Sequence, residues 1–135
     1  MNVKPVTGPT RVKRTTSDTS ESLRVGATLD AWLARDWSQG IYLGALEEFQ
    51  QIHVVTQNSL YELVLVNRCG DVRVRGGRYF PDWTPARLAG CTAGGSFLKR
   101  LGINLGLQME FEIGRRRILT SSVRSIALLE KPLPA

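Results

Sequence analysis

Valine and arginine alternate from Val72 to Arg75, and Gly76 and Gly77 then end the alternation. A period of two is typical of a β-strand with one apolar face and one solvated face. A glycine pair at the end of such a pattern indicates a bulge or a sharp bend. We therefore expect a small, bent β structure whose outer face carries arginine side chains.

The same kind of pattern recurs along the C-terminal two-thirds of the chain. Its clearest instance is Leu105–Ile113, where apolar residues alternate with glycine, glutamine and glutamate. Further strands are expected over residues 52–56, 60–66, 72–75, 117–122 and 123–129. Turn signals separate these strands at intervals of about 8–12 residues, which is typical of an all-β barrel or sandwich. The sequence predicts a mainly β domain over residues 52–131, built as a five- or six-stranded bent antiparallel barrel with glycine pairs at its corners.

Two stretches inside this domain are expected to interrupt the strands. Asp82–Pro85 predicts a loop, and Pro85 predicts the start of a brief helical turn, since proline fits the first turn of a helix. Gly90–Ser96 is rich in glycine and predicts a bend. Such a stretch could also cradle phosphate, but the chain holds neither a GxxxxGK[ST] nor a GxGxxG motif.

Residues 26–51 are expected to hold one short amphipathic helix and a connection. The helix is predicted over residues 28–37, with Thr28 as its N-cap. Helical spacing places four apolar residues on one face: Leu29, Trp32, Leu33 and Trp37. This face either covers an open side of the β domain or docks onto another protein. Residues 41–51 fit a short strand or a helix equally well.

Residues 1–25 are basic and rich in serine and threonine, without apolar periodicity. We interpret them as a flexible tail. The basic segment Arg11–Arg14 precedes Thr15–Ser17, an arrangement that fits either a solvated tail or a phosphorylation patch.

Positive charge is concentrated at both ends of the chain. Residues 1–25 hold five basic and two acidic side chains. Residues 26–52 hold one basic and four acidic side chains, and residues 53–135 hold twelve basic and six acidic side chains. A basic surface attracts nucleic acid, anionic lipid or an acidic protein. The plainer alternative is a soluble protein with a mild positive excess.

Several chemistries are disfavoured by the residue types present. Two cysteines without a CxxC pair, and a single histidine, are too few for a zinc site, so we expect no metal and no cofactor. His53, Ser96 and Cys91 are the residues that an enzyme could use, but Ser96 lacks the spacing of a nucleophile elbow. We expect a non-enzymatic protein. Without a membrane-length apolar run or a secretory h-region, we also expect a cytoplasmic location.

Four motifs give the chain a family likeness. They are Thr56–Tyr61 (TQNSLY), Arg75–Pro81 (RGGRYFP), Gly90–Ser96 (GCTAGGS) and Thr120–Val123 (TSSV). Over about residues 52–126 the chain resembles a group of small bacterial proteins of unknown function. The resemblance implies a bacterial origin and a compact β domain, and it transfers no functional residue.

The expected outer face defines the candidate binding residues. Arginine matches phosphate in a bidentate way, and aromatic rings can stack on bases. The candidates are Arg73, Arg75, Arg78, Tyr79, Trp83, Lys99, Arg100, Arg115, Arg116 and Arg117. In the plainer interpretation the arginines only solvate the surface while the aromatic residues fill the core. Glu110 and Glu112 are expected on one strand face, opposite Arg117 and residues near Thr120 across the turn at Gly114–Arg116, where cross-strand charge pairing would occupy them.

The leading functional expectation is a binding module whose basic face contacts RNA, single-stranded DNA or an acidic partner. The alternative is a structural or accessory subunit that docks into a larger assembly or a homo-oligomer through the tryptophan-bearing helix and the tail.

Overall fold

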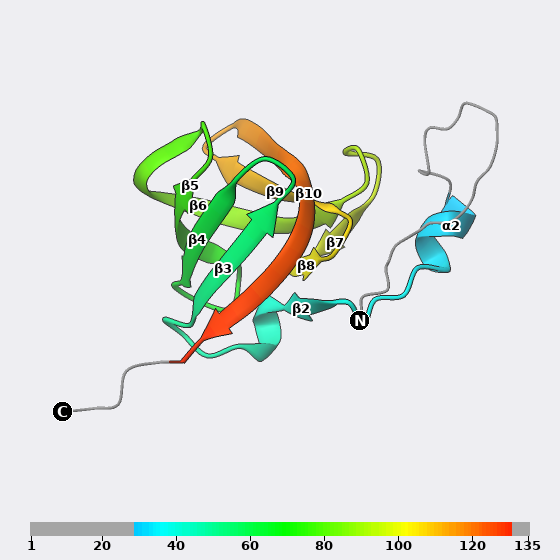
Figure 1. Cartoon of the computed structure of the whole chain (residues 1–135), viewed down its shortest axis with the longest axis horizontal. Coiled ribbons are helices and arrows are strands. Elements are labelled where there is room, and N and C mark those ends of the chain that lie inside the picture. Colours follow the sequence, from blue (N-terminus) through cyan, green and yellow to red (C-terminus); the bar gives the residue numbers. More distant parts are fainter. Residues whose placement is uncertain (1–28, 131–135) are drawn as a thin grey trace.

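The computed structural model describes residues 29–130 of the chain. The predicted tail, the proposed N-cap Thr28 and the residues after Glu130 lie outside the described residues. The described part is mainly β, with one short α-helix (Figure 1). The mainly β architecture expected from the sequence is therefore confirmed.

The helical elements are α2 (Leu29–Leu33) and the 3₁₀ turn η2 (Leu43–Ala45). The strands are β2 (Gly40–Tyr42), β3 (Gln51–Thr56), β4 (Leu60–Leu65), β5 (Asp71–Gly76), β6 (Phe80–Thr92), β7 (Leu98–Arg100), β8 (Gly102–Asn104), β9 (Gln108–Ile113) and β10 (Arg116–Leu129).

Seven strands form one antiparallel sheet in the order β5-β4-β3-β10-β9-β6-β7. Strand β5 also pairs with β6, so the pairings return to their starting strand and close a ring. Strands β2 and β8 form a separate two-stranded sheet. In Figure 1 the ring strands surround one interior, and α2 stands to one side of them.

Two long strands make the ring possible because each one bridges two neighbours. Strand β6 pairs with β5 over residues 80–87 and with β9 over residues 87–92. Strand β10 pairs first with β9 and then, from Val123 onward, with β3. Both strands carry register shifts near the change of partner, between Leu88 and Gly90 and between Val123 and Ser125. Such bulges bend a strand, which is what closure requires.

The alternation that predicts a strand at Val72–Arg75 is confirmed in detail. Val72 and Val74 are buried, whereas Arg73 and Arg75 are exposed. The buried sides of the ring strands meet in one core, which includes Ile52, Val54, Leu63, Leu65, Leu88 and Met109. Three aromatic rings also lie there, and the centroids of Phe80 and Phe111 are 5.2 Å apart in an edge-to-face contact.

The ambiguous segment over residues 41–51 becomes a short strand followed by a 3₁₀ turn. Leu43 is fully buried in the core, and its N–H donates to the carbonyl oxygen of Leu101 at 2.8 Å. Leu46 packs partly buried against the same core. This segment therefore covers part of the interior, a role that the tryptophan-bearing helix does not perform.

The helix is shorter than the predicted range of residues 28–37, since α2 ends at Leu33. Beyond it, the N–H and hydroxyl of Ser38 both donate to Oδ1 of Asp36, at 2.9 and 2.6 Å. Such local side-chain bonds compete with a helix for the backbone.

The predicted loop and helical turn at Asp82–Pro85 are wrong, because both lie inside the continuous strand β6. Proline is tolerated there since β6 pairs only with β5 before residue 87, so its other edge has no ladder to lose. The strand expected from Leu105 begins only at Gln108, because Gly106 adopts a positive φ of 83° in a turn. The two strands expected over residues 117–122 and 123–129 are one strand, β10.

Candidate functional site

All ten candidate binding residues lie at the surface. Tyr79 is 48% exposed and Trp83 is 43% exposed, so neither ring fills the core. The ten residues fall into two groups on different elements. The first group, here the hairpin cluster, lies on β5, β6 and their connection: Arg73, Arg75, Arg78, Tyr79 and Trp83. The second group lies on β7 and around the β9–β10 turn: Lys99, Arg100, Arg115, Arg116 and Arg117.

Two arginines of the hairpin cluster lie over aromatic rings. The guanidinium carbon of Arg75 is 4.7 Å from the centroid of Trp83, and that of Arg78 is 5.6 Å from the centroid of Tyr79. Both distances are within the range of a cation–π contact. Strands β5 and β6 pair so that Val74 faces Thr84, which brings Arg75 and Trp83 to neighbouring places on the outer face. The sequence identifies these residues as candidates, and the pairing of β5 with β6 brings them into contact.

Glu62 of β4 moderates the charge of this cluster. It is the cross-strand partner of Arg75, whose Nε donates to Oε1 of Glu62 at 2.9 Å. Arg73 and Arg78 make no ion pair with any residue between 29 and 130. The cluster therefore offers two uncompensated guanidinium groups beside one that is fixed by a carboxylate.

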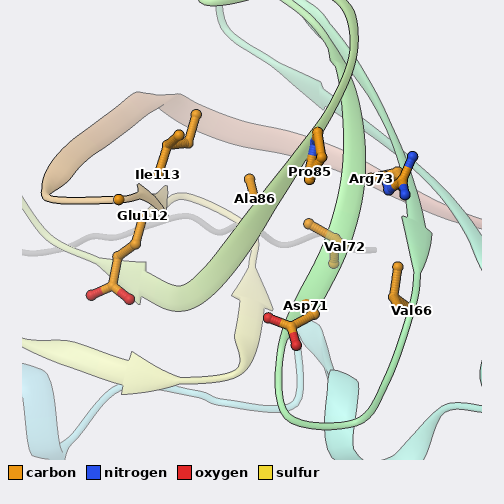
Figure 2. Close-up of a pocket in the computed structure, with 9 residues that line it drawn as sticks. Val66, Asp71, Val72, Arg73, Pro85, Ala86, Glu112 and Ile113 are labelled. Atoms are coloured by element: carbon orange, nitrogen blue, oxygen red, sulfur yellow. The ribbon is translucent and has the colours of Figure 1, made fainter.

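An open depression of about 400 Å³ borders the hairpin cluster at Arg73. Figure 2 shows two of its lining residues, Val72 and Ala86, between Arg73 on one side and Glu112 on the other. Asp71 also lines it, so acidic and basic groups face the same space. Because of this mixed charge, the depression is a weaker candidate for an anion than the outer face of the hairpin.

The second group is partly committed to structural contacts. Arg117 forms a bidentate pair with Glu110, with Nε to Oε2 and Nη2 to Oε1 both at 3.1 Å. The Glu110 side chain is only 9% exposed, so this pair satisfies a nearly buried carboxylate. The expected cross-strand pairing of Glu110 is thus confirmed. Glu112 is exposed and lies opposite Arg87 and Arg117 in the strand register.

The other cations of the second group remain exposed. Lys99 and Arg100 lie on the short strand β7, and the Nζ of Lys99 is 5.1 Å from the ring centroid of Trp37. Arg115 and Arg116 lie at the β9–β10 turn, next to Gly114 with its positive φ of 59°. Neither arginine makes an ion pair within the described part of the chain. These two residues therefore form a small basic tip apart from the hairpin cluster.

The four predicted docking residues divide into two pairs. Trp32 contacts Trp37 edge-to-face at 4.7 Å and stacks on Phe97 at 5.7 Å. Leu29 and Leu33 are 54% and 68% exposed. The tryptophans thus hold α2 against the β6–β7 connection, while the two leucines face outward.

The three reactive residues considered for catalysis have different surroundings. Cys91 is buried, and burial raises the pKa of its thiol to about 12, which keeps it protonated. His53 lies on β3 between Glu62 of β4 and Ala127 of β10. Ser96 is exposed in the β6–β7 connection. Among residues 29–130, no group of three or more histidine, cysteine or acidic side chains is arranged to hold a metal ion.

Two residues that hold the α2 segment in place are not indicated by the sequence. Phe97 follows a glycine-rich stretch without periodicity, so nothing in the sequence indicates its contact with Trp32. Arg35 donates from Nη2 to the carbonyl oxygen of Leu105 at 2.6 Å, and burial lowers the pKa of its guanidinium. It anchors the segment after α2 to the turn before β9. Both contacts depend on chain segments far apart in sequence.

Three comparisons, with protein-family models, with curated proteins and with solved structures, find no match to this chain. The resemblance to small bacterial proteins stays an expectation from the sequence. No helix within residues 29–130 is long and apolar enough to cross a membrane.

Proposed function

We propose that the ring of pairings is a small six-stranded barrel, and that the chain is a non-enzymatic binding module for single-stranded RNA or DNA. The hairpin cluster on β5 and β6 is the contact surface. A cytoplasmic location belongs to the same proposal.

The observation that carries this proposal is the exposure of guanidinium groups and aromatic rings side by side on one hairpin. Arg75 and Trp83, and Arg78 and Tyr79, are in cation–π contact at the surface. An exposed ring can accept a base on its face, and a neighbouring guanidinium can bind the adjacent phosphate. Because both rings stay about half-exposed beside these guanidinium groups, they offer surface on which bases can stack.

The arrangement favours single strands over duplexes. In a duplex the bases are stacked on each other, and their faces are not available to Tyr79 or Trp83. Stacking of a base on an aromatic side chain contributes about 1–3 kcal/mol, a share that a duplex would forgo. Discrimination between single-stranded and double-stranded probes is therefore expected.

The test is fluorescence anisotropy with a labelled single-stranded oligonucleotide, in RNA and DNA form, and with the matching duplex. Trp83→Ala is expected to weaken single-strand binding by about 5–100-fold, from the stacking contribution. Tyr42→Ala is the matched control, since Tyr42 is also an exposed ring (53%) but lies on β2. Equal losses in both variants, or no binding by the native chain at low salt, would refute the proposal.

Charge variants distinguish the two cationic groups. Arg73→Ala with Arg78→Ala should weaken binding, whereas Arg115→Ala with Arg116→Ala should leave it nearly unchanged. With about three phosphates neutralised, log K should fall with log salt at a slope of about −2. The opposite ranking of the double variants would move the interface to the β9–β10 turn. A salt-sensitive interaction with an acidic polypeptide, but with no oligonucleotide, would identify an acidic protein partner.

A second candidate function rests on the exposed face of α2. Leu29 and Leu33 are more than half exposed while the adjacent tryptophans are engaged, which leaves an apolar surface for a larger assembly. Light scattering at high salt tests it. An assembly that is lost in Leu33→Ser but retained in Tyr42→Ser would favour a structural subunit, and an unchanged mass in both would exclude this route.

A further inference from the structure

Strand β10 has a free edge over residues 124–129. Figure 1 shows β10 continuing beyond β9 and running alongside β3 to its end. The last backbone contacts on the β9 side belong to Val123, whose N–H donates to Leu107 and whose carbonyl accepts from Gly106, both at 2.8 Å. From residue 124 to residue 129, no strand of the described part pairs along that side.

The direction of the backbone groups follows from the β3 ladder. Thr56 N–H donates to Ser59, and the Gln50 carbonyl accepts from Leu65, both on the β4 side. Because backbone groups alternate in direction along an antiparallel strand, the odd-numbered residues of β3 face β10. Their register partners on β10 are Ser125, Ala127 and Leu129. The even-numbered residues of this stretch, Ile126 and Leu128, therefore direct their N–H and C=O groups toward the free edge.

Between Ser125 and Leu129 this edge carries neither proline nor a charged side chain. The other unpaired stretch of a ring strand, on β6 before residue 87, carries Pro81 and Pro85, which block pairing. On β10 the residues from Ser125 to Leu129 are apolar or small, and Leu128 is 45% exposed although its register partner Ile52 is fully buried. An exposed, proline-free edge of this kind can accept a further strand.

We propose that the occupant is a second copy of this chain, which adds its own β10 antiparallel across a two-fold axis at Ala127. In this register Ile126 lies opposite Leu128 of the partner subunit. Each such pair exchanges two backbone hydrogen bonds, and the two-fold axis supplies the pair twice. The side chains of both pairs lie on the core side of the strand, so Leu128 is covered by an apolar neighbour.

Charge complementarity selects this register. The same two-fold axis brings Arg124, the bulge residue before Ser125, near Glu130 of the partner subunit, which directly follows the end of β10. The reverse pair forms on the other side of Ala127. Both side chains are exposed, and neither makes an ion pair within residues 29–130. A cross-strand pair of opposite charges stabilises a ladder, whereas like charges directly opposite destabilise it. The edge is thus complementary to itself in backbone, apolar side chains and charge.

The test is sedimentation equilibrium of the full chain over a micromolar concentration range. A dimer is expected, with a dissociation constant raised about tenfold by Arg124→Glu and by Glu130→Arg, each of which creates two like-charge contacts. The double variant Arg124→Glu with Glu130→Arg should restore the native value. Arg116→Glu, the same charge change on the β10 stretch that pairs with β9, is the matched control and should have no effect.

A backbone variant provides an independent check. Leu128→Pro removes an N–H that faces the free edge, so it should abolish the dimer while circular dichroism still reports the folded chain. A monomer at every concentration would overturn the proposal. A dimer whose dissociation constant does not change in the charge variants would also overturn the proposal, because the contact would then lie on another face. The same holds if the double variant does not restore the native dissociation constant.

Discussion

Gly90 is a position where one added methyl group should force two neighbouring strands apart. Its φ is +151°, and an added Cβ would lie 2.0 Å from the carbonyl oxygen of Lys99 on β7. The strained backbone costs about 1–3 kcal/mol. Relieving the clash requires β6 and β7 to separate by about 1 Å or more, which adds about 1–3 kcal/mol of overpacking. We expect Gly90→Ala to lower the free energy of unfolding by about 2–6 kcal/mol.

Gly94→Ala separates the steric effect from the conformational one. Gly94 also has a positive φ, +67°, but an added Cβ would meet nothing within 4 Å. The control should therefore lose only about 1–2 kcal/mol. Urea denaturation followed by tryptophan fluorescence measures both variants. Equal losses at the two glycines, or a native-like midpoint for Gly90→Ala, would refute the close approach of β7 to β6.

Three further outcomes follow from the core and the ion pairs. Arg117→Met should lower the free energy of unfolding by about 1–3 kcal/mol, because it leaves the nearly buried Glu110 carboxylate without its cation. The control Arg116→Met should change this free energy little in the same urea experiment. Cys69, which is exposed, should react with a thiol reagent at pH 8, while Cys91 should react only after unfolding; comparable rates would contradict its burial. Because folding raises the pKa of the Cys91 thiol to about 12, the unfolded chain loses this proton at a lower pH than the folded chain. The free energy of unfolding should therefore fall by about 1.4 kcal/mol per pH unit from about pH 9 toward 12. The Cys91→Ala variant should show a smaller decline.

The sequence predicts a strand well where the alternation of apolar and polar residues matches one face on the core and one face in solvent. Val72 and Val74 alternate with arginines because β5 has one face on the core and one in solvent, and period two reports that directly. The exposed positions of Arg73 and Arg75 follow from the same alternation. The short β9–β10 turn predicts that Arg117 meets the glutamates of β9, but not which of them. The register places Arg117 opposite Glu112, whereas its ion pair is with Glu110, one step along the diagonal.

The errors arise where long-range contacts decide the local structure. Pro85 predicts a break, but it lies in a strand because the ring leaves one edge of β6 unpaired at that point. The alternating pattern over Leu105–Ile113 extends into a turn at Gly106. The N–H of Gly106 donates to the carbonyl oxygen of Val123 on the neighbouring strand β10, a contact that the pattern does not reveal. The contact between Trp32 and Phe97 spans 65 residues of sequence, so neither helical spacing nor strand alternation indicates it.

The most direct test of the central claim, that the hairpin cluster binds single-stranded nucleic acid, is an amide chemical-shift titration of the chain with an unlabelled single-stranded oligonucleotide. We predict shifts concentrated between residues 71 and 87, with the indole N–H of Trp83 among the largest, and their suppression by salt. Shifts confined to the β9–β10 turn or to α2, or no shifts at low salt, would contradict the account.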